Sequence, residues 1–327
     1  MSGVKCITKF CRVTAVFLAC TLFMSGCGLP YSFAYDPDSS VTSFRLNDSK
    51  TDGRADSFAS SLCITNGNDD QDQLDLGENE AAGLFDIKNA KTIYGQNLLA
   101  QMQPASLTKV MTALVALQNC QPDQMLTATE NVKITESGAQ VAGIKAGDKM
   151  TLDQALHILL IESANDAAVL IAENVGGSVD GFTKMMNDEA KKLGATGCNF
   201  VNPNGLTASE HYVTAYDMYL ILNAASQYEL FNQIISMSSY STEYYDASGN
   251  AVSIETTSTN QYIKGTVDAP DNITVIGGKT GTTDAAGHCL ILYVKNAPGD
   301  PFIAVILNTK NIDELYDHMN KLLALIK

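Results

Sequence analysis

Blocks of apolar and polar positions follow one another along the chain, and the period within each block predicts its secondary structure. Short apolar runs at 82–86 and 92–94 flank the polar segment 89–91, which is typical of a β-hairpin. Apolar positions within 110–117 then recur at helical spacing, and Pro104 suits the first turn of that helix. This part of the pattern therefore predicts a hairpin followed by a buried helix.

The middle of the chain, from about 120 to 270, has a mostly helical pattern. Thr151 and Gln154 have the spacing of a capping box ahead of apolar residues at helical positions. Two further helices are predicted at 166–174 and 178–193, separated by a pair of glycines. We therefore expect an all-helical insert over this part of the chain.

Strands return near the end of the chain. Apolar runs at 273–278, 289–294 and 302–307 predict three strands, and Asn311 caps a final amphipathic helix from 312 to 326. Helices thus interrupt a sheet whose strands come from both ends of the chain. The predicted fold class is α/β (α+β), an antiparallel sheet flanked by helices plus the all-helical subdomain.

The first residues have the pattern of an export leader. Basic residues precede the apolar run 13–24, which is too short to cross a bilayer comfortably. Residues 24–27, Met-Ser-Gly-Cys, are similar to a lipoprotein cleavage site, whereas Ser32-Phe33-Ala34 suits ordinary signal cleavage. We expect 1–26 to be a lipoprotein-type signal peptide and lipidated Cys27 to hold the protein on the outer membrane face, with ordinary secretion as the alternative.

The segment after the leader is acidic and polar. Residues 28–80 hold eleven Asp or Glu against three Lys or Arg, among many Ser, Asn and Gly. This composition predicts a disordered acidic tether at 27–57, ahead of a folded domain at 58–327. Within residues 28–80, the run 61–65 is the only apolar stretch, and it is compatible with an added edge strand.

Charge and cysteine content exclude two classes of protein. The net charge of −15 disfavours nucleic-acid binding. Cysteines and the four histidines are scattered, without the spacing of a metal site, so we expect no metal and no cofactor. After the leader and Cys27, four cysteines remain, for which buried thiols are favoured over a disulfide: Cys63, Cys120, Cys198 and Cys289.

Three short motifs occur once each and in a fixed order: Ser106-Leu107-Thr108-Lys109, Ser163-Ala164-Asn165 and Lys279-Thr280-Gly281. A serine hydroxyl needs a base within hydrogen-bonding reach and donors for the oxyanion that its attack creates. Lys109 lies one helical turn from Ser106, and it is a base only when burial and a nearby positive charge, such as Lys279, lower its pKa. Together the motifs indicate serine acyl transfer.

With these motifs the chain resembles the serine-type D-alanyl-D-alanine carboxypeptidases, the low-molecular-mass penicillin-binding proteins of peptidase family S11. The resemblance covers roughly residues 80 to 310 and includes Asn202-Pro203-Asn204-Gly205-Leu206 and Ala286-Gly287-His288-Cys289-Leu290. It implies the penicillin-recognising serine hydrolase fold. It also implies removal of the terminal D-alanine from peptidoglycan stem pentapeptides, and β-lactams as covalent inhibitors.

The resemblance also assigns roles to the motif residues. It makes Ser106 the nucleophile, Lys109 the general base and Ser163 a proton relay. Asn165 would hold the substrate backbone, and Lys279 with Thr280 would bind the terminal carboxylate. The backbone N–H groups of Ser106 and Thr282 would form the oxyanion hole, and Gly281 would leave room for a substrate beside the strand.

Two other functions stay open. A class A β-lactamase usually has Ser-Asp-Asn as its second motif, where this chain has Ala164, and Glu229 with Asn232 imitates its water-positioning loop only poorly. A non-catalytic receptor for wall peptides or β-lactams would not need the intact catalytic side chains. His211 and His288 are less favoured as general bases than Lys109.

Overall fold

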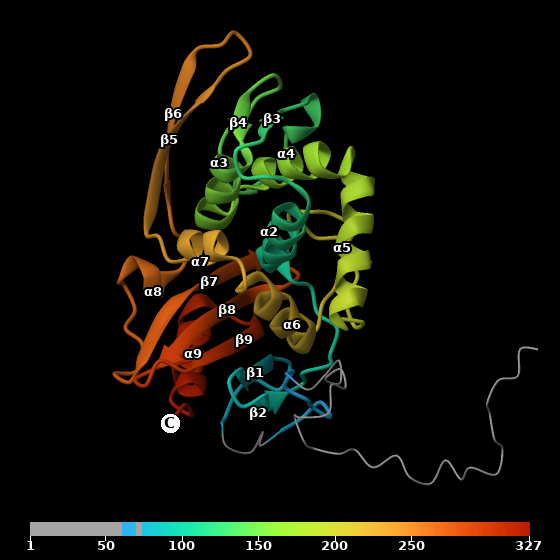
Figure 1. Ribbon diagram of the computed structural model, residues 1–327. Helices are drawn as coiled ribbons and strands as arrows, with labels where there is room; N and C mark the ends of the chain where they lie inside the picture. The colour runs from blue at the N-terminus through green and yellow to red at the C-terminus, as the bar shows by residue number, and fades with distance from the viewer. Residues whose placement is uncertain (1–60, 70–73) are drawn as a thin grey trace, which may run out of the picture. The chain divides into compact units, whose positions relative to one another are not determined.

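The computed structural model describes residues 61–69 and 74–327 (Figure 1). The predicted signal peptide, lipidated Cys27 and tether lie outside the described residues. No helix in the described part of the chain is long and apolar enough to cross a membrane.

A five-stranded antiparallel sheet forms one layer of the fold, in the order β2-β1-β9-β8-β7. Its strands are β1 (Ala81–Asp86), β2 (Lys91–Gln96), β7 (Ile273–Thr283), β8 (Gly287–Asn296) and β9 (Pro301–Thr309). The predicted hairpin and the three predicted C-terminal strands are therefore confirmed. The sheet joins both ends of the described chain, and β7 lies at its edge.

Both faces of this sheet are covered. Along β9, Ile303, Val305 and Leu307 belong to the large core shared with the helices, whereas Ala304 and Ile306 pack under α9 (Ile312–Leu323). Successive side chains of a strand point to opposite faces, so a strand buried on both reads as an unbroken apolar run. The final helix is capped by Asn311 as predicted, and it ends three residues before the predicted boundary.

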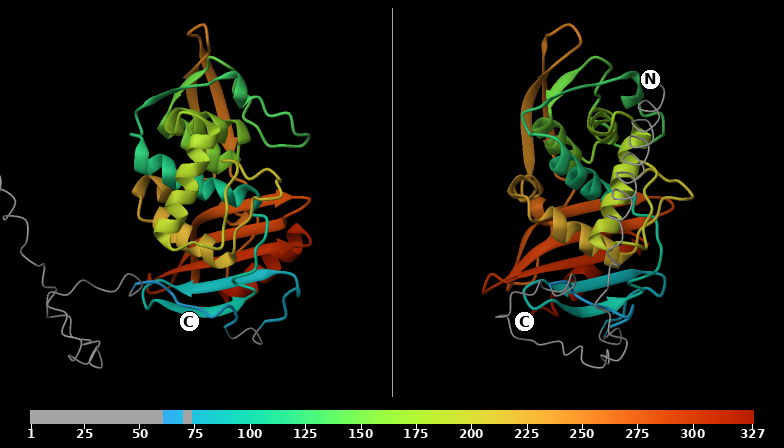
Figure 2. Two further views of the ribbon diagram at one scale, coloured as in Figure 1. Left: turned by 90° about the vertical axis from the view of Figure 1, so that its right-hand side faces the viewer. Right: turned by 45° about the vertical axis from the view of Figure 1, so that its right-hand side comes forward.

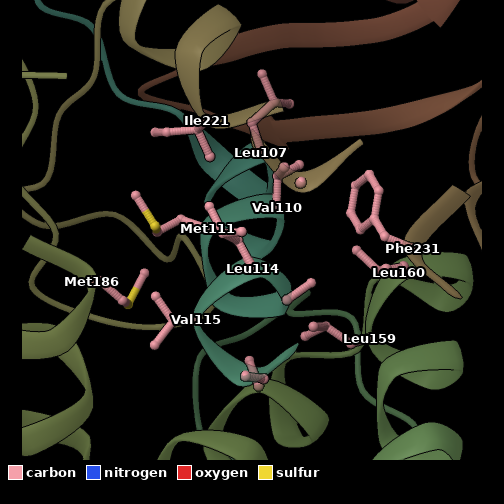
Figure 3. Packing of buried hydrophobic residues seen from close by; sticks show 14 of the residues in the cluster. Leu107, Val110, Met111, Leu114, Val115, Leu159, Leu160, Met186, Ile221 and Phe231 are labelled. Atoms are coloured by element: carbon pink, nitrogen blue, oxygen red, sulfur yellow. The ribbon is translucent and has the colours of Figure 1, made fainter. Parts of the chain in front are cut away.

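The helices pack around a buried central helix. This helix, α2 (Thr108–Asn119), follows the short 3₁₀ turn η3 (Ala105–Leu107), and Figure 3 shows its apolar side chains in contact with neighbours on several sides. Met186 of α5, Ile221 of α6 and Phe231 of α7 are among these neighbours. The surrounding helical elements are η4 (Glu130–Val132), α3 (Leu152–His157), η5 (Ile158–Glu162), α4 (Asn165–Gly176), α5 (Val179–Leu193), α6 (Ala215–Ala225), α7 (Glu229–Ile235) and α8 (Gln261–Lys264).

The fold class is confirmed, but the insert is not all-helical. It contains a second antiparallel sheet, in the order β3-β4-β5-β6, whose strands are β3 (Met125–Thr127), β4 (Lys149–Thr151), β5 (Ser239–Tyr245) and β6 (Ala251–Thr257). Figure 2 shows β5 and β6 as a long hairpin beside the helices. Much of this hairpin is exposed, so the sequence of β5 consists of tyrosine, threonine and other polar residues and does not alternate with aliphatic ones. The apolar signal of a strand is therefore weak there.

Several local predictions are confirmed and one is only partly realised. Thr151 and Gln154 form the predicted capping box, and α5 begins after the cap Ser178. The run 61–65 forms no named strand but a single parallel bridge from Ile64 to Lys91. The four cysteines that were expected to be thiols are all free.

Candidate active site

Ser106 lies in the tight turn that opens the central helix. Ala105, just before it, has a φ of +46°, a left-handed conformation that is costly for a residue with a Cβ. The Nζ atom of Lys109 lies 2.8 Å from Ser106 Oγ, so the two side chains share one face as predicted. The turn thus places a hydroxyl against an amine at the start of a buried helix.

Lys109 is fully buried, and its amine has two further partners. Its Nζ lies 2.8 Å from Asn165 Oδ1 and 2.7 Å from the carbonyl oxygen of Asn204. Both of these atoms can only accept a hydrogen bond. A neutral amine has two hydrogens, which these two acceptors use, so its lone pair is left facing the Ser106 hydroxyl. This is the geometry of a general base.

The surroundings favour that neutral form. Burial is the largest cause that holds the pKa of Lys109 well below its usual value, and the nearby charge of Lys279 lowers it further. The carboxylate of Asp166 acts in the opposite direction. Burial also lowers the pKa of Lys279, to about 7. The predicted cause of a basic Lys109, burial plus Lys279, is present in the structure.

The second motif follows a π-helical turn. Residues of η5 widen the end of α3, and Ser163 then adopts a left-handed conformation with a φ of +66° before α4 begins. The motif therefore lies between two helical elements. The side-chain oxygen of Asn165 accepts a hydrogen bond from Lys109, so the NH₂ group of Asn165 is the donor available to a ligand.

The third motif lies on β7 beside Ser106. A Cβ added to Gly281 would lie 2.9 Å from the backbone nitrogen of Ser106 and 2.9 Å from Leu107 Cδ1. Glycine is therefore required by the approach of the strand to η3, whether or not a substrate is present. Lys279 is buried, and its Nζ donates to the Thr280 carbonyl at 2.9 Å, so its charge lies beneath the surface of the site.

These motifs meet at a cleft of about 530 Å³. Its lining includes the motif residues Ser106, Ser163, Asn165, Thr280, Gly281 and Thr282. One rim is the loop 136–140, whose Gln140 carbonyl accepts the Asn165 backbone N–H at 2.8 Å. Thr259 adds a hydroxyl 2.6 Å from that of Thr280. This rim and Thr259 were not predicted from the sequence, since neither has a motif of its own.

Asn204 and Asp166 also do more than the sequence indicated. The segment 202–206 forms a turn whose Asn204 carbonyl accepts a hydrogen bond from the Lys109 amine. Asp166 accepts backbone N–H groups of Ala142, Gly143 and Ile144 at 2.8–3.0 Å, which ties the segment after the rim loop to α4. The sequence signal for Asn204 was its place in the segment 202–206 that carries the resemblance, and that for Asp166 was its position directly after the second motif.

The less favoured residues contact other groups. His211 Nε2 lies 2.8 Å from Thr108 Oγ1, and His288 Nδ1 lies 3.2 Å from Thr282 Oγ1. Glu229 accepts a hydrogen bond from Gln233 in its own helix, and it is not among the described residues that line the cleft. Residues 61–69 and 74–327 contain no group of three or more His, Cys, Asp or Glu arranged to hold a metal.

The sequence model of a known family, D-alanyl-D-alanine carboxypeptidase, matches residues 70–311. The chain belongs to this family. The resemblance drawn from the motifs is therefore confirmed.

Individual relatives agree with this membership in the D-alanyl-D-alanine carboxypeptidase family. The carboxypeptidase DacF of Bacillus subtilis is 31% identical over 250 residues, which cover 75% of this chain and 61% of DacF. A D-alanyl-D-alanine endopeptidase of Escherichia coli is 30% identical over 230 residues, covering 67% of this chain and 68% of the relative. The chain thus spans about six tenths of the length of DacF.

A solved structure shows the same fold. The Streptomyces K15 DD-transpeptidase superposes with a TM-score of 0.69 at 24% identity, over 75% of this chain and 95% of the transpeptidase. The predicted penicillin-recognising serine hydrolase fold is confirmed by this likeness.

Proposed function

We propose that the protein is a serine-type D-Ala-D-Ala carboxypeptidase that removes the terminal D-alanine from peptidoglycan stem pentapeptides. The observation that carries this proposal is the environment of Lys109, whose two acceptors and depressed pKa leave its lone pair facing the Ser106 hydroxyl. Membership in the family supplies the substrate class. Peptidoglycan lies outside the cytoplasm, so the protein acts there.

The reaction begins with the serine. Ser106 Oγ attacks the carbonyl carbon of the D-Ala-D-Ala bond while Lys109 takes the hydroxyl proton. The backbone N–H groups of Ser106 and Thr282 hold the oxyanion. Ser163 relays the proton from Lys109 to the departing amine, so that the C–N bond breaks and free D-alanine leaves. Water then attacks the ester on Ser106 and releases the shortened peptide.

The remaining cleft residues orient the substrate. The Asn165 NH₂ group donates to the substrate backbone, and the peptide lies along the edge strand β7. Its terminal carboxylate lies against the hydroxyl of Thr280, above the buried charge of Lys279. A β-lactam carries a reactive amide and a carboxylate in a similar arrangement, and it acylates Ser106 as a covalent inhibitor.

Attachment to the membrane is part of this proposal. The pattern of 1–26 supports export, and residues 24–27 support lipidation of Cys27, with residues 27–57 as the tether to the catalytic domain. Palmitate labelling in cells of the wild-type chain and of Cys27→Ala tests this part by itself. Equal labelling of the two chains would rule out a lipid at Cys27.

The activity is tested with the full chain purified in detergent. We expect a fluorescent penicillin to label Ser106 durably, as located by digestion and mass spectrometry, and D-alanine to be released from an acyl-D-Ala-D-Ala stem-peptide mimic. Ser106→Ala is the control and should abolish both. Durable label without D-alanine release would contradict the proposal and favour a receptor, whereas rapid nitrocefin hydrolysis would favour a β-lactamase. Preferential cleavage of cross-linked dimers would indicate an endopeptidase.

A further inference from the structure

His211 joins two segments of the site that are distant in sequence. Its ring is buried between the turn that contains Val201 and the first turn of α2. Nδ1 accepts the Val201 backbone N–H at 3.1 Å, and Nε2 lies 2.8 Å from Thr108 Oγ1. The ring also contacts Phe200 edge to face, with centroids 5.7 Å apart. Every polar atom of the imidazole therefore has a partner.

These partners fix the direction of each hydrogen bond. Nδ1 faces an N–H donor, so it must be the acceptor, and a neutral imidazole then carries its hydrogen on Nε2. Thr108 Oγ1 accepts that hydrogen and donates its own to the Ala105 carbonyl at 2.9 Å. Burial lowers the pKa of His211 to about 4, which agrees with a neutral ring. The result is a chain of donors from His211 through Thr108 to Ala105.

Ala105 is the residue whose conformation sets the position of Ser106. Its left-handed backbone carries a strain that the surroundings must hold in place. Its carbonyl accepts both the hydroxyl and the backbone N–H of Thr108 on one side and faces Gly205 on the other, where an added Cβ would come within 1.8 Å of the oxygen. The Gly205 turn therefore packs closely against this carbonyl.

We propose that His211 is a positioning residue for the nucleophile, which acts through Thr108 to fix the Ala105 carbonyl and so places Ser106 Oγ against Lys109 Nζ. The imidazole takes no part in proton transfer to the substrate, because its two nitrogens are used by Val201 and Thr108. This inference rests on the proposed function, in which Ser106 is the nucleophile. It adds a residue that supports the reaction from outside the cleft.

The test separates binding of a penicillin from the acylation step. Stopped-flow labelling of the full chain gives the dissociation constant of the initial complex and the acylation rate constant at saturation. His211→Phe keeps a flat ring beside Phe200 but has neither hydrogen bond, and Thr108→Val removes only the hydroxyl. Thr108→Ser restores that hydroxyl. Thr183→Val is the matched control, because Thr183 is a buried threonine that donates to a carbonyl three residues earlier in α5, away from the site.

We expect His211→Phe and Thr108→Val each to lower the acylation rate constant by about 10- to 100-fold, with the dissociation constant changed less than about threefold. Both residues act through the same series of hydrogen bonds. The acylation rate constant of the double variant should therefore lie within about threefold of that of the slower single variant. Thr108→Ser should recover most of the rate, and the Thr183→Val control should match the wild type.

Three results would overturn the inference. They are a folded His211→Phe protein with a wild-type acylation rate, a double variant in which the two losses multiply, and a Thr108→Ser variant as slow as Thr108→Val. If His211→Phe does not fold, the two Thr108 variants decide by themselves. Failure of the proposed function is a separate result, because wild-type protein would then carry no label on Ser106.

Discussion

Two buried lysines of the site have opposite requirements. In the proposed mechanism Lys109 has to be neutral to accept the Ser106 proton, whereas Lys279 has to be charged to attract a carboxylate. Burial lowers the pKa of both, and the charge of Lys279 lowers that of Lys109 still further. The Lys279 amine donates to the Thr280 carbonyl, whereas Lys109 has the two acceptors that direct its lone pair. The proposed mechanism thus assigns two different tasks to one residue type, because the surroundings of the two lysines differ.

We predict a bell-shaped pH dependence of kcat/KM for D-alanine release. On the acid side activity rises as Lys109 loses its proton, and on the alkaline side it falls near pH 7 as Lys279 loses its charge, since its pKa is lowered to about 7. The measurement is kcat/KM between pH 5 and 10 on the stem-peptide mimic, with Lys279→Ala for comparison. Constant kcat/KM from pH 7 to 9 would contradict the role given to Lys279.

The lowered pKa of Lys279 also makes the stability of the fold depend on pH. Below about pH 7 the folded protein has to bury the Lys279 charge, while the unfolded chain keeps it in water. Between about pH 7 and the ordinary lysine value of 10.5 the unfolded chain binds more protons at this site, so the contribution of Lys279 to the free energy of unfolding rises with pH. Urea unfolding at pH 7 and 9 should show this rise, and Lys279→Met should reduce it.

At the scale of elements, the site depends on contacts between loops and helix ends. The segment between the rim loop 136–140 and β4 has no regular structure around Ala142 to Ile144, and Asp166 at the start of α4 accepts three of its N–H groups. Asp166 is buried, so these bonds are charge-assisted and shielded from water. One carboxylate thereby fixes the segment that follows the rim loop, two residues beyond the Gln140 carbonyl that accepts from Asn165.

We expect Asp166→Asn to lower the free energy of unfolding by about 2–4 kcal/mol, because the NH₂ group of asparagine cannot accept from the backbone N–H groups. Asp188→Asn is the control: its exposed ion pair with Lys184 should contribute less than about 1 kcal/mol. Urea unfolding followed by far-UV circular dichroism measures both variants. Equal effects of the two substitutions would show that the segment after the rim loop is held by other contacts.

At the scale of the whole described unit, the sheet and the helices share one core. The ring of Phe85 in β1 stacks on Tyr219 of α6 with centroids 4.2 Å apart, and both rings are fully buried. The same cluster continues through α2 to α5 and α7. The active-site cleft lies where these layers meet, so motif residues from distant parts of the chain are held by a continuous packed interior.

Phe85→Ala should therefore destabilise the whole unit. We expect a loss of about 3–5 kcal/mol in the free energy of unfolding, with a single unfolding transition, because the cavity would open between the sheet and the helices. Leu99→Ala is the comparison, since Leu99 is exposed and its loss should change stability by less than about 0.5 kcal/mol. Two separate transitions in urea would show that sheet and helices unfold independently.

The strands of the main sheet and the ends of the helices could be predicted because their signals are local. Apolar runs identify β8 and β9. Thr151 and Asn311 each cap a helix by accepting the backbone N–H of the residue three positions later. The hairpin β5–β6 was missed, since its exposed strands lack an apolar pattern, although the turn at 246–250 between two segments rich in Thr and Tyr was a usable signal.

The sequence by itself predicted which residues carry the proposed chemistry. Ser106 and Lys109 lie one helical turn apart, so their contact follows from the geometry of a helix, and the motif order identified the family. Only the tertiary structure decided how Lys109 is held, because its acceptors Asn165 and Asn204 are brought to it by different segments. The burial of Lys279, the anchoring by Asp166 and the link through His211 likewise depend on packing between segments. Local spacing encodes contacts within one element, whereas contacts across the core are fixed by how all the elements fill space together.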